Sequence, residues 1–192
     1  MEDDQLMRRA QGGDRGAFSV LFERYEKPIY NFLRRLGMIP AEAEEGTQEV
    51  FLKLWERRSQ YRPGGVFRVY LYQIARNHRI GRFRRPALDA RRYLAPRMGG
   101  TGGAVGVGGQ AIHQDDPAAA AERRELGVRV HHLLDELPEG VREPFVLRWM
   151  QQLPYAEVAR ITGLTVRQAE DRVAAGFERL ASRLRPRAEG KP

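Results

Sequence analysis

The chain of 192 residues contains no cysteine, and this absence excludes three kinds of chemistry. Without a thiol it can form no disulfide, no thiolate nucleophile and no cysteine-ligated zinc site. The four histidines, His78, His113, His131 and His132, show no metal-ligand spacing with nearby acids. His131 and His132 would point about 100° apart on a helix, too far to converge on one ion. The sequence therefore predicts no metal, no cofactor and no catalytic residue, and a metal-dependent enzyme is the least supported class of function.

Long apolar runs are also missing. No run approaches the ~20 apolar residues of a membrane span, and no apolar stretch follows the acidic start Met1-Glu2-Asp3-Asp4 as it would in a signal peptide. The sequence thus predicts a soluble, cytoplasmic protein without membrane insertion. No segment has the alternation of a strand, whereas apolar residues recur at helical spacing. The expected fold class is all-α.

A glycine-rich stretch divides the chain. From Gly99 to Gly109, seven of eleven residues are glycine, and such a run cannot bury a core. A flexible tether of about 36 residues spans roughly 33 Å. No lysine followed by serine or threonine accompanies these glycines, so they do not indicate a phosphate-binding loop. The sequence predicts two small helical domains, residues 1–86 and 122–187, a flexible linker at 87–121 and a disordered tail at 188–192.

Two prolines are expected to interrupt helices in the first domain. Pro28 lies within a helical pattern from Phe18 to Leu36. It should kink or divide that helix, because proline lacks the amide donor and crowds the preceding turn. Pro86 is expected to end a helix that begins near Val66.

Positive charge is concentrated in the first domain, where residues 1–85 carry a net +6 against +2 for residues 122–187. Between Glu56 and Asp89 there are nine arginines, no carboxylate, and several interleaved aromatic residues. Guanidinium groups bind phosphates and aromatic rings stack on exposed bases. This segment therefore predicts binding to a nucleic-acid strand, provided that the arginines form an exposed cationic track and are not locked in ion pairs within the fold.

A second long helix is expected from Ala41 to Arg58, and acids crowd its first turns at Glu42, Glu44 and Glu45. Negative charge there complements the positive end of the helix dipole, an explanation that needs no partner and that composition favours. The alternative is a docking face for a basic protein surface.

The second domain contains the pattern of a helix-turn-helix. A helix from Tyr155 to Thr162 is followed by a glycine turn and by a helix from Thr165 to about Leu184. Thr165 and Gln168 have the spacing of a capping box, which marks the start of that last helix. The second helix of such a motif enters the major groove of DNA. An ordinary helical hairpin is the alternative, but the turn and the cap favour DNA binding.

Taken in order, these motifs resemble the extracytoplasmic-function (ECF) sigma factors, which are promoter-recognition subunits of bacterial RNA polymerase. Ala43-Glu44-Glu45 followed by Gln48 to Trp55 is similar to the family's polymerase-clamp-binding helix. Phe67 to Asn77 resembles its promoter-melting segment, and Leu137 to Arg172 resembles its second conserved domain. The combination is specific to the family, although no single motif is.

The resemblance implies binding to core RNA polymerase, promoter recognition, DNA melting and transcription initiation, with an anti-sigma factor as a further partner. Polymerase contacts are expected from Glu45, Gln48, Glu49 and Trp55. The downstream (minus-10) element is expected as single-stranded DNA on Arg62, Phe67, Arg68, Tyr70, Arg76, Asn77, Arg79 and Arg82, with one or two of the rings at 67, 70 and 72 in the core. The upstream (minus-35) element is expected as duplex DNA on Thr165, Arg167, Gln168, Glu170, Asp171 and Arg172.

Three features depart from the family pattern. Gly46 replaces a usual leucine, Gly81 replaces a usual acid, and the helix after Thr165 carries Glu170 and Asp171 where lysine and small polar residues are common. Glutamate can accept a hydrogen bond from a cytosine amino group, so these acids are compatible with DNA reading. They also leave open an alternative, a sigma-like regulator whose second domain binds a protein partner and not DNA.

Overall fold

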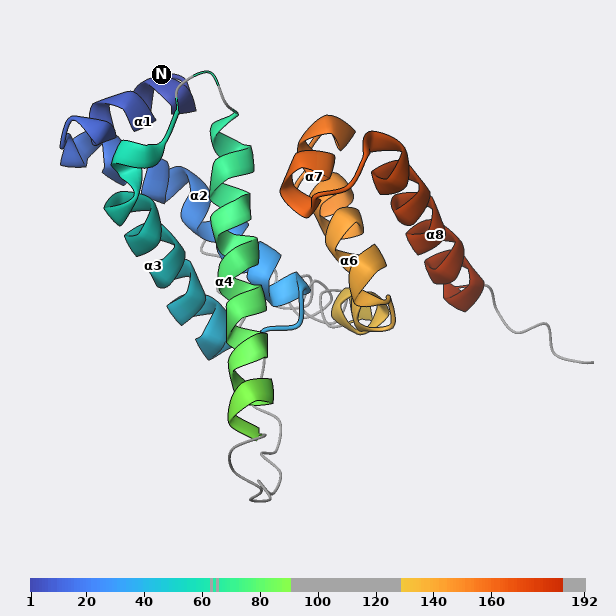
Figure 1. The fold of residues 1–192 in the computed structure, drawn as a ribbon. Helices are drawn as coiled ribbons and strands as arrows, with labels where there is room; N and C mark the ends of the chain where they lie inside the picture. Colours follow the sequence, from blue (N-terminus) through green and yellow to red (C-terminus); the bar gives the residue numbers. More distant parts are fainter. Residues whose placement is uncertain (63, 65, 91–128, 185–192) are drawn as a thin grey trace, which may run out of the picture.

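The computed structural model describes residues 1–62, 64, 66–90 and 129–184, and every regular element among them is helical. The all-α prediction is therefore confirmed. The first half contains α1 (Asp3–Gln11), α2 (Arg15–Arg35), α3 (Pro40–Glu56), the short 3-10 helix η1 (Arg58–Gln60) and α4 (Phe67–Ala90). The second half contains helical residues 129–135, α6 (Glu139–Phe145), the π-helical turn η2 (Val146–Met150), α7 (Tyr155–Thr162) and α8 (Val166–Leu184), as Figure 1 shows.

Glycines and prolines act differently as helix breakers in the first half. Gly13 adopts a left-handed conformation with φ of +90° and separates α1 from α2, whose first turn is capped by the Asp14 carboxylate. However, α2 runs unbroken through Pro28, so the proline does not divide it. The expectation that Pro86 ends a helix is wrong, because α4 continues to Ala90. A proline removes one amide donor, and the backbone hydrogen bonds on either side can still hold the helix.

The core of the first half lies where α1, α2, α3 and α4 meet. Two of the aromatic residues of α4 belong to it, since Phe67 and Tyr72 are each only 2% exposed. The Phe67 ring lies edge-on to Tyr25 with centroids 5.4 Å apart, and the Tyr72 ring lies edge-on to Phe32 at 5.2 Å. The expectation that one or two of the three rings belong to the core is thus confirmed, and Tyr70 is the half-exposed one.

The helix-turn-helix forms as its sequence predicts. Gly163 ends α7 in a left-handed conformation with φ of +75°, which glycine adopts without steric cost. Thr165 and Gln168 form the reciprocal capping box. The Thr165 amide donates to Gln168 Oε1 at 2.9 Å, and the Gln168 amide donates to Thr165 Oγ1 at 3.2 Å. Both bonds are local in sequence, which is why the start of α8 could be predicted.

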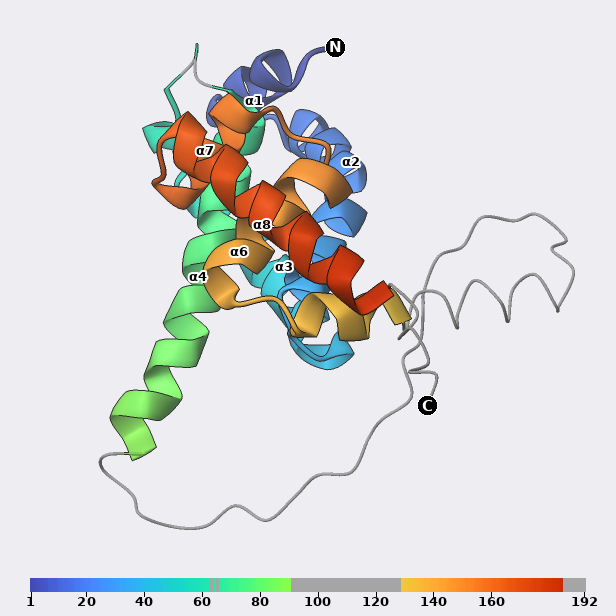
Figure 2. The same cartoon turned by 90° about the vertical axis from the view of Figure 1, so that its right-hand side faces the viewer.

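Helix α4 lies between the rest of the first half and the second half. Figure 1 shows α3 on one side of α4 and α6, α7 and α8 on the other, and Figure 2 shows α7 and α8 in front of α4 with α3 behind. The second half therefore covers one face of the arginine-bearing helix, while α3 lies on the opposite side of the molecule. The predicted linker beyond residue 90, the first residues of the predicted second domain and the tail at 188–192 lie outside the described residues.

Candidate nucleic-acid interface

Three arginines of α4 are paired with carboxylates of the second half. Arg68 lies 2.8 Å from Glu157, Arg76 lies 3.0 Å from Glu143, and Arg79 lies 2.6 Å from Glu139. The arginine numbers rise along α4 as the glutamate numbers fall, so the two sets match in antiparallel order. The second half lies against α4 here, and we call this the closed arrangement. In the closed arrangement the expectation of an exposed cationic track is wrong for these three arginines, because acids of the second half lie over them.

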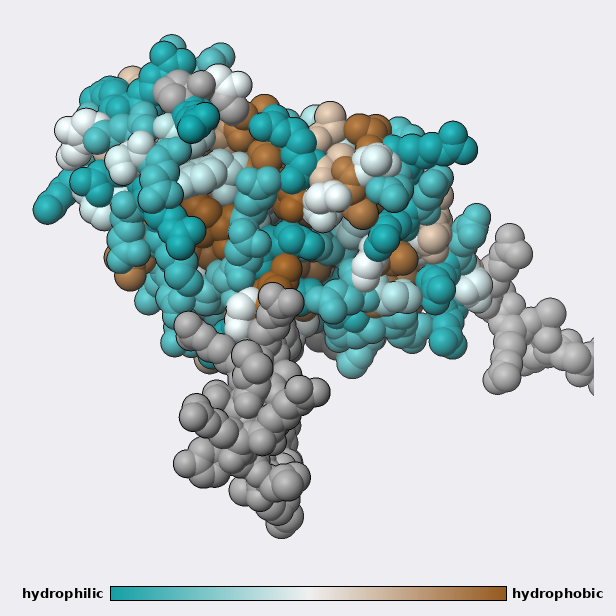
Figure 3. Space-filling view, viewed as in Figure 1, coloured by the Kyte–Doolittle hydropathy of each residue, from teal (hydrophilic) through white to brown (hydrophobic). Residues whose placement is uncertain are grey.

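Polar contacts between the halves continue beside these ion pairs. The Tyr72 hydroxyl donates to Gln151 Oε1 at 2.8 Å, and the Gln73 amide nitrogen donates to the Arg160 carbonyl at 2.8 Å. The outer face seen in Figure 3 is mostly hydrophilic, with smaller hydrophobic patches. Partly exposed ion pairs are each worth only about 0.2–1 kcal/mol, so the three pairs by themselves hold the halves together only weakly.

Arg82, further along α4, pairs within the first half. Its guanidinium lies 2.7 Å from Glu45 and 3.7 Å from Glu42. The acids at the start of α3 therefore have a role beyond the helix dipole, since they hold α3 to α4. The Glu45 side chain is still 57% exposed and can be reached from outside.

His78 of α4 explains the unusual glycine in α3. A Cβ atom at Gly46 would lie 3.0 Å from His78 Nε2 and 3.1 Å from Leu33 Cδ1, so a leucine at this position would have no room. His78 Nδ1 lies 3.1 Å from Glu49 and 3.2 Å from Lys53 Nζ. Burial, and then the nearby Lys53 charge, lower the pKa of His78 below its usual value.

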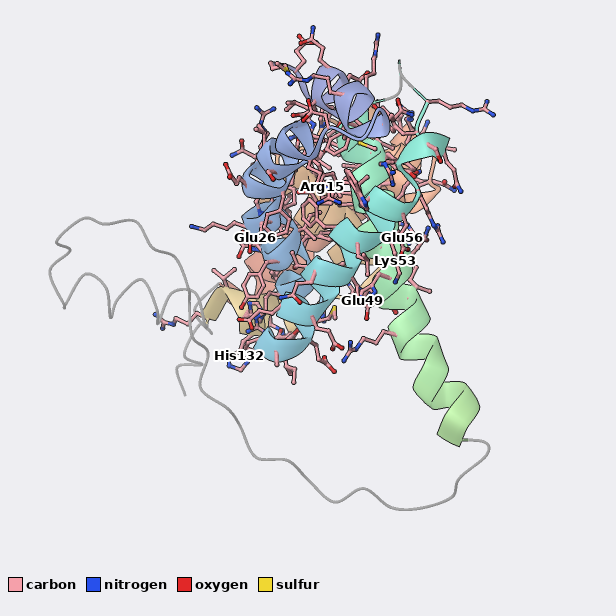
Figure 4. The ribbon with its side chains drawn as sticks, turned by 90° about the vertical axis from the view of Figure 1, so that its left-hand side faces the viewer. Arg15, Glu26, Glu49, Lys53, Glu56 and His132 are labelled. Carbon is pink, nitrogen blue, oxygen red and sulfur yellow. The ribbon has the colours of Figure 1, made fainter. Side chains whose placement is uncertain are left out.

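One of the residues expected to bind polymerase, Glu49, lies on the side of α3 away from the second half. Figure 4 shows Glu49, Lys53 and Glu56 in succession along this helix, and Gln48 is exposed nearby. The half-buried Trp55 ring lies edge-on to Phe18, with centroids 5.0 Å apart. The second half therefore covers one face of α4 and leaves Glu49 and the exposed Gln48 accessible.

A cavity of about 240 Å³ lies beside the chain that follows η1. Its lining includes Tyr61, the exposed Arg62 and the half-buried Tyr70, whose ring centroid lies 5.4 Å from that of Tyr61. Arg160 of the second half lines the same cavity, so the second half reaches its edge. The cavity combines an aromatic wall with a cation, as a site for an unstacked base requires.

The residues expected to read the upstream element gather at the start of α8, with one exception. Thr165, Arg167, Gln168, Glu170 and Asp171 are exposed there. Arg172 is exposed as well, but its guanidinium donates to the Gly140 carbonyl at 2.8 Å and lines a cavity of about 280 Å³ together with Arg76 and Arg79. Asn77, which is expected to contact the downstream element, is exposed on α4.

Comparisons with known proteins agree with this architecture. The family model of sigma-70 region 2 matches residues 21–87 and that of sigma-70 region 4 matches residues 127–180, together more than half of the chain. The RNA polymerase sigma-H factor of Pseudomonas aeruginosa is 29% identical, over 96% of this chain and 95% of that protein. The ECF RNA polymerase sigma factor SigW of Bacillus subtilis is 27% identical, over 93% of this chain and 95% of that protein. The chain belongs to the ECF sigma factors.

A solved structure supports the fold of this sigma factor. The sigma factor RpoE in complex with the anti-sigma factor NepR, from Bartonella quintana, superposes with a TM-score of 0.68 at 18% identity, covering 88% of this chain and 98% of that one. As an ECF sigma factor, the protein is a transcription initiation factor and not an enzyme: it binds core RNA polymerase and directs it to promoter DNA.

Three residues that shape this sigma factor's interface were not predicted from the sequence. They are the acids Glu139, Glu143 and Glu157. A signal for the acids was present, because Glu139 and Glu143 are four residues apart, as suits a helix face, in a half with a net charge of only +2. Nothing in the sequence showed that this face lies on α4.

Two further findings concern the described part of the sigma factor alone. None of its helices combines the length and apolar character needed to cross a bilayer. Within the same residues, no cluster of three or more histidine and acidic side chains is arranged to hold a metal ion.

Proposed function

We propose that residues 1–86 hold core polymerase through α3 and bind the downstream promoter element as a single strand, while residues 122–187 read the upstream element as duplex. The observation that carries this division is the cavity lined by Tyr61 and Tyr70, which also has the exposed Arg62 in its lining. Polymerase docking falls to four residues of α3, namely Glu45, Gln48, Glu49 and Trp55.

The cavity is proposed to receive a base extruded from the melted downstream element. Extrusion costs a few kcal/mol, and stacking on an aromatic ring returns about 1–3 kcal/mol per base. Tyr70 supplies the half-exposed ring for stacking. The buried Phe67 packs on Tyr61 with centroids 6.1 Å apart, and Tyr61 in turn packs on Tyr70. Arg62, Arg68, Arg76, Arg79 and Arg82 then neutralise phosphates along the strand, and Asn77 offers its amide to a base edge.

This function requires the closed arrangement to open. Arg68, Arg76 and Arg79 cannot bind phosphates while they are paired with Glu157, Glu143 and Glu139. Because α3 lies on the other side of α4, polymerase can dock on it first and the second half can then leave α4. Exchange of a carboxylate for a phosphate keeps each guanidinium paired with an anion, so the opened state leaves no arginine without a partner.

An anti-sigma factor is proposed as the regulatory partner, acting with this sigma factor in the cytoplasm, where core polymerase and promoter DNA are found. The solved complex of RpoE with NepR supports this proposal by its similar fold. A protein that holds the two halves together would keep the arginines of α4 covered. The second half also exposes two large apolar side chains, Trp149 at 52% and Phe177 at 41%, with ring centroids 4.9 Å apart, that could contact such a protein.

Run-off transcription with purified core enzyme tests the function as a whole. Promoter-specific transcripts are expected on addition of the sigma factor, and failure to retain core polymerase in a pull-down would overturn the proposal.

The roles of the second half are separated by replacing Glu170→Lys and Asp171→Ser together. A DNA-reading α8 should change its preferred upstream sequence, whereas a second half that binds only protein should leave promoter choice unchanged. Glu178→Lys, also on the exposed surface of α8 but beyond its first turns, is the matched control and should not alter the preferred sequence.

A further inference from the structure

Helix α1 holds the chain segment that forms one wall of the cavity. The Asp4 carboxylate accepts hydrogen bonds from the Tyr61 hydroxyl and from the Gly64 amide, the latter at 3.2 Å. The Gln11 side-chain amide donates to the Arg58 carbonyl at 3.0 Å and to the Tyr61 carbonyl at 2.8 Å. These contacts fix the segment at η1, at Tyr61 and at the following turn.

The held segment determines the shape of the cavity. Gln60, Tyr61 and Arg62 line it directly. Tyr61 is only 4% exposed, and its ring packs on both Tyr70 and Phe67. A shift of this segment would therefore change the distance between the two tyrosine rings that bound the cavity.

The chemistry of the two α1 side chains suits this positioning. The Gln11 amide satisfies two backbone carbonyls at once, and a carboxylate of the same shape would face both of them without a proton to donate. Asp4 offers two acceptor oxygens to two donors, one of which belongs to Gly64, a residue in a left-handed conformation with φ of +91°. Both contacts bridge residues roughly fifty positions or more apart, so local chain geometry cannot replace them.

We propose that Asp4 and Gln11 are positioning residues that set which base the downstream cavity accepts. They touch no DNA themselves and act through Tyr61 and the turn that follows it. The inference rests on the proposed function of the cavity, and it adds that base preference depends on two residues of α1 that contact Tyr61 and its neighbours and not the base.

The test uses holoenzyme reconstituted from core polymerase and each sigma variant. Each holoenzyme selects DNA from a library randomised across both promoter elements, and base preference is counted at every position. Tyr70→Ala identifies the position served by the cavity, because its preference should flatten there. Gln11→Glu should lower the preference at that same position by about fivefold, the effect of roughly one hydrogen bond. Preferences in the upstream element should not change.

Controls separate positioning from general damage. Gln5→Glu makes the same chemical change at an exposed position of α1 and should leave all preferences as in the wild type. Asp4→Ala should flatten the same position as Gln11→Glu. Asp4→Asn keeps one acceptor oxygen and should recover part of the preference, which a merely destabilised fold would not do.

Three results would overturn the inference. The first is that Gln11→Glu and Asp4→Ala both keep the wild-type base preference at that position. This result would contradict the inference but not the proposed function of the cavity. The second is an equal loss of preference at all positions in both elements, which indicates a structural role only. The third is a wild-type holoenzyme with no downstream preference at all, which removes the proposed function of the cavity and the inference with it.

Discussion

The guanidinium of Arg76 lies 3.0 Å from the carboxylate of Glu143, although 67 positions separate the two residues. The Arg76 side chain is 27% exposed and that of Glu143 is 12% exposed, so the pair is partly shielded from solvent. A cation proposed to bind promoter phosphate is therefore already paired with an acid of the same chain. Promoter binding by this sigma factor must then depend on how easily that acid is displaced.

Removal of the interface acids should open the free sigma factor. We expect the triple variant Glu139→Gln, Glu143→Gln, Glu157→Gln to bind a single-stranded oligonucleotide about tenfold more tightly than the wild type, because three pairs of about 0.2–1 kcal/mol each no longer compete. Its radius of gyration should increase as the halves separate. Fluorescence anisotropy measures the first effect and small-angle X-ray scattering the second.

The matched control changes net charge equally without touching the interface. Glu170→Gln, Asp171→Asn and Glu178→Gln remove three exposed acids of α8. This variant should bind the oligonucleotide only slightly more tightly, through its charge, and should keep the wild-type radius. Equal behaviour of the two triple variants would mean that the ion pairs across α4 do not hold the halves together.

Local sequence was enough to predict the helix-turn-helix, but it could not predict the long-range contacts. The Thr165 cap depends on Gln168, three residues away, and the Gly163 amide donates to the Ala159 carbonyl, four residues away, so neighbouring residues explain both features. The pair of Arg68 with Glu157 joins residues 89 positions apart and depends on where the second half lies. Considered by itself, the arginine-rich helix is therefore predicted to form an exposed cationic track, although in the folded chain the second half covers it.

The burial pattern along α4 could be predicted only in part from the sequence. Phe67, Leu71, Ile74 and His78 recur at helical spacing and form the stripe that faces the core. Tyr70 lies off that stripe and also off the stripe that faces the second half, and this explains why it alone of the three rings is half-exposed. Residues 68, 72, 76 and 79 form a second stripe, and this one faces the second half. Its burial could not be predicted, because three of its four members are arginines.

Arginine substitutions should separate the two DNA-binding surfaces. In holoenzyme, Arg76→Ala and Arg82→Ala should each weaken binding to single-stranded downstream DNA irrespective of its sequence and reduce the salt slope by about 1, because one phosphate contact is lost. Arg167→Ala should instead alter the preferred upstream duplex sequence. Binding titrations at several salt concentrations measure both effects. Equal losses from all three substitutions would contradict the proposed division between the halves.

Two glycines should respond in opposite directions to alanine. A Cβ atom at Gly176 would lie 2.7 Å from Phe145 Cδ2, so Gly176→Ala should destabilise the packing of α8 on α6 by about 1–3 kcal/mol through overpacking. A Cβ atom at Gly81 meets nothing within 4 Å, so Gly81→Ala should stabilise α4 by about 1 kcal/mol through helix propensity. Denaturant unfolding followed by circular dichroism gives both changes. Destabilisation by both substitutions would show that α4 needs a glycine for another reason.

Acidification should destabilise this sigma factor in the range where histidine titrates. Burial lowers the pKa values of His78 and His131 from the usual 6.5, so both rings resist protonation in the folded chain. The unfolded chain binds more protons below that value, and the free energy of unfolding must therefore fall as pH drops through 6.5 towards the lowered pKa values. Glu49, whose pKa is lowered from 4.5 chiefly by its hydrogen bond from Lys53, contributes in a separate and more acidic range.

Urea unfolding between about pH 7.5 and pH 5.5 isolates the histidine contribution. The wild type should lose stability across this interval, and His78→Gln should reduce the dependence on pH, because glutamine cannot titrate. His132→Gln, at an exposed position of the helix that also carries His131, should keep the wild-type dependence. The same slope in His78→Gln as in the wild type would mean that the ring beside Gly46 is not held in its neutral form by the packing of α3 on α4.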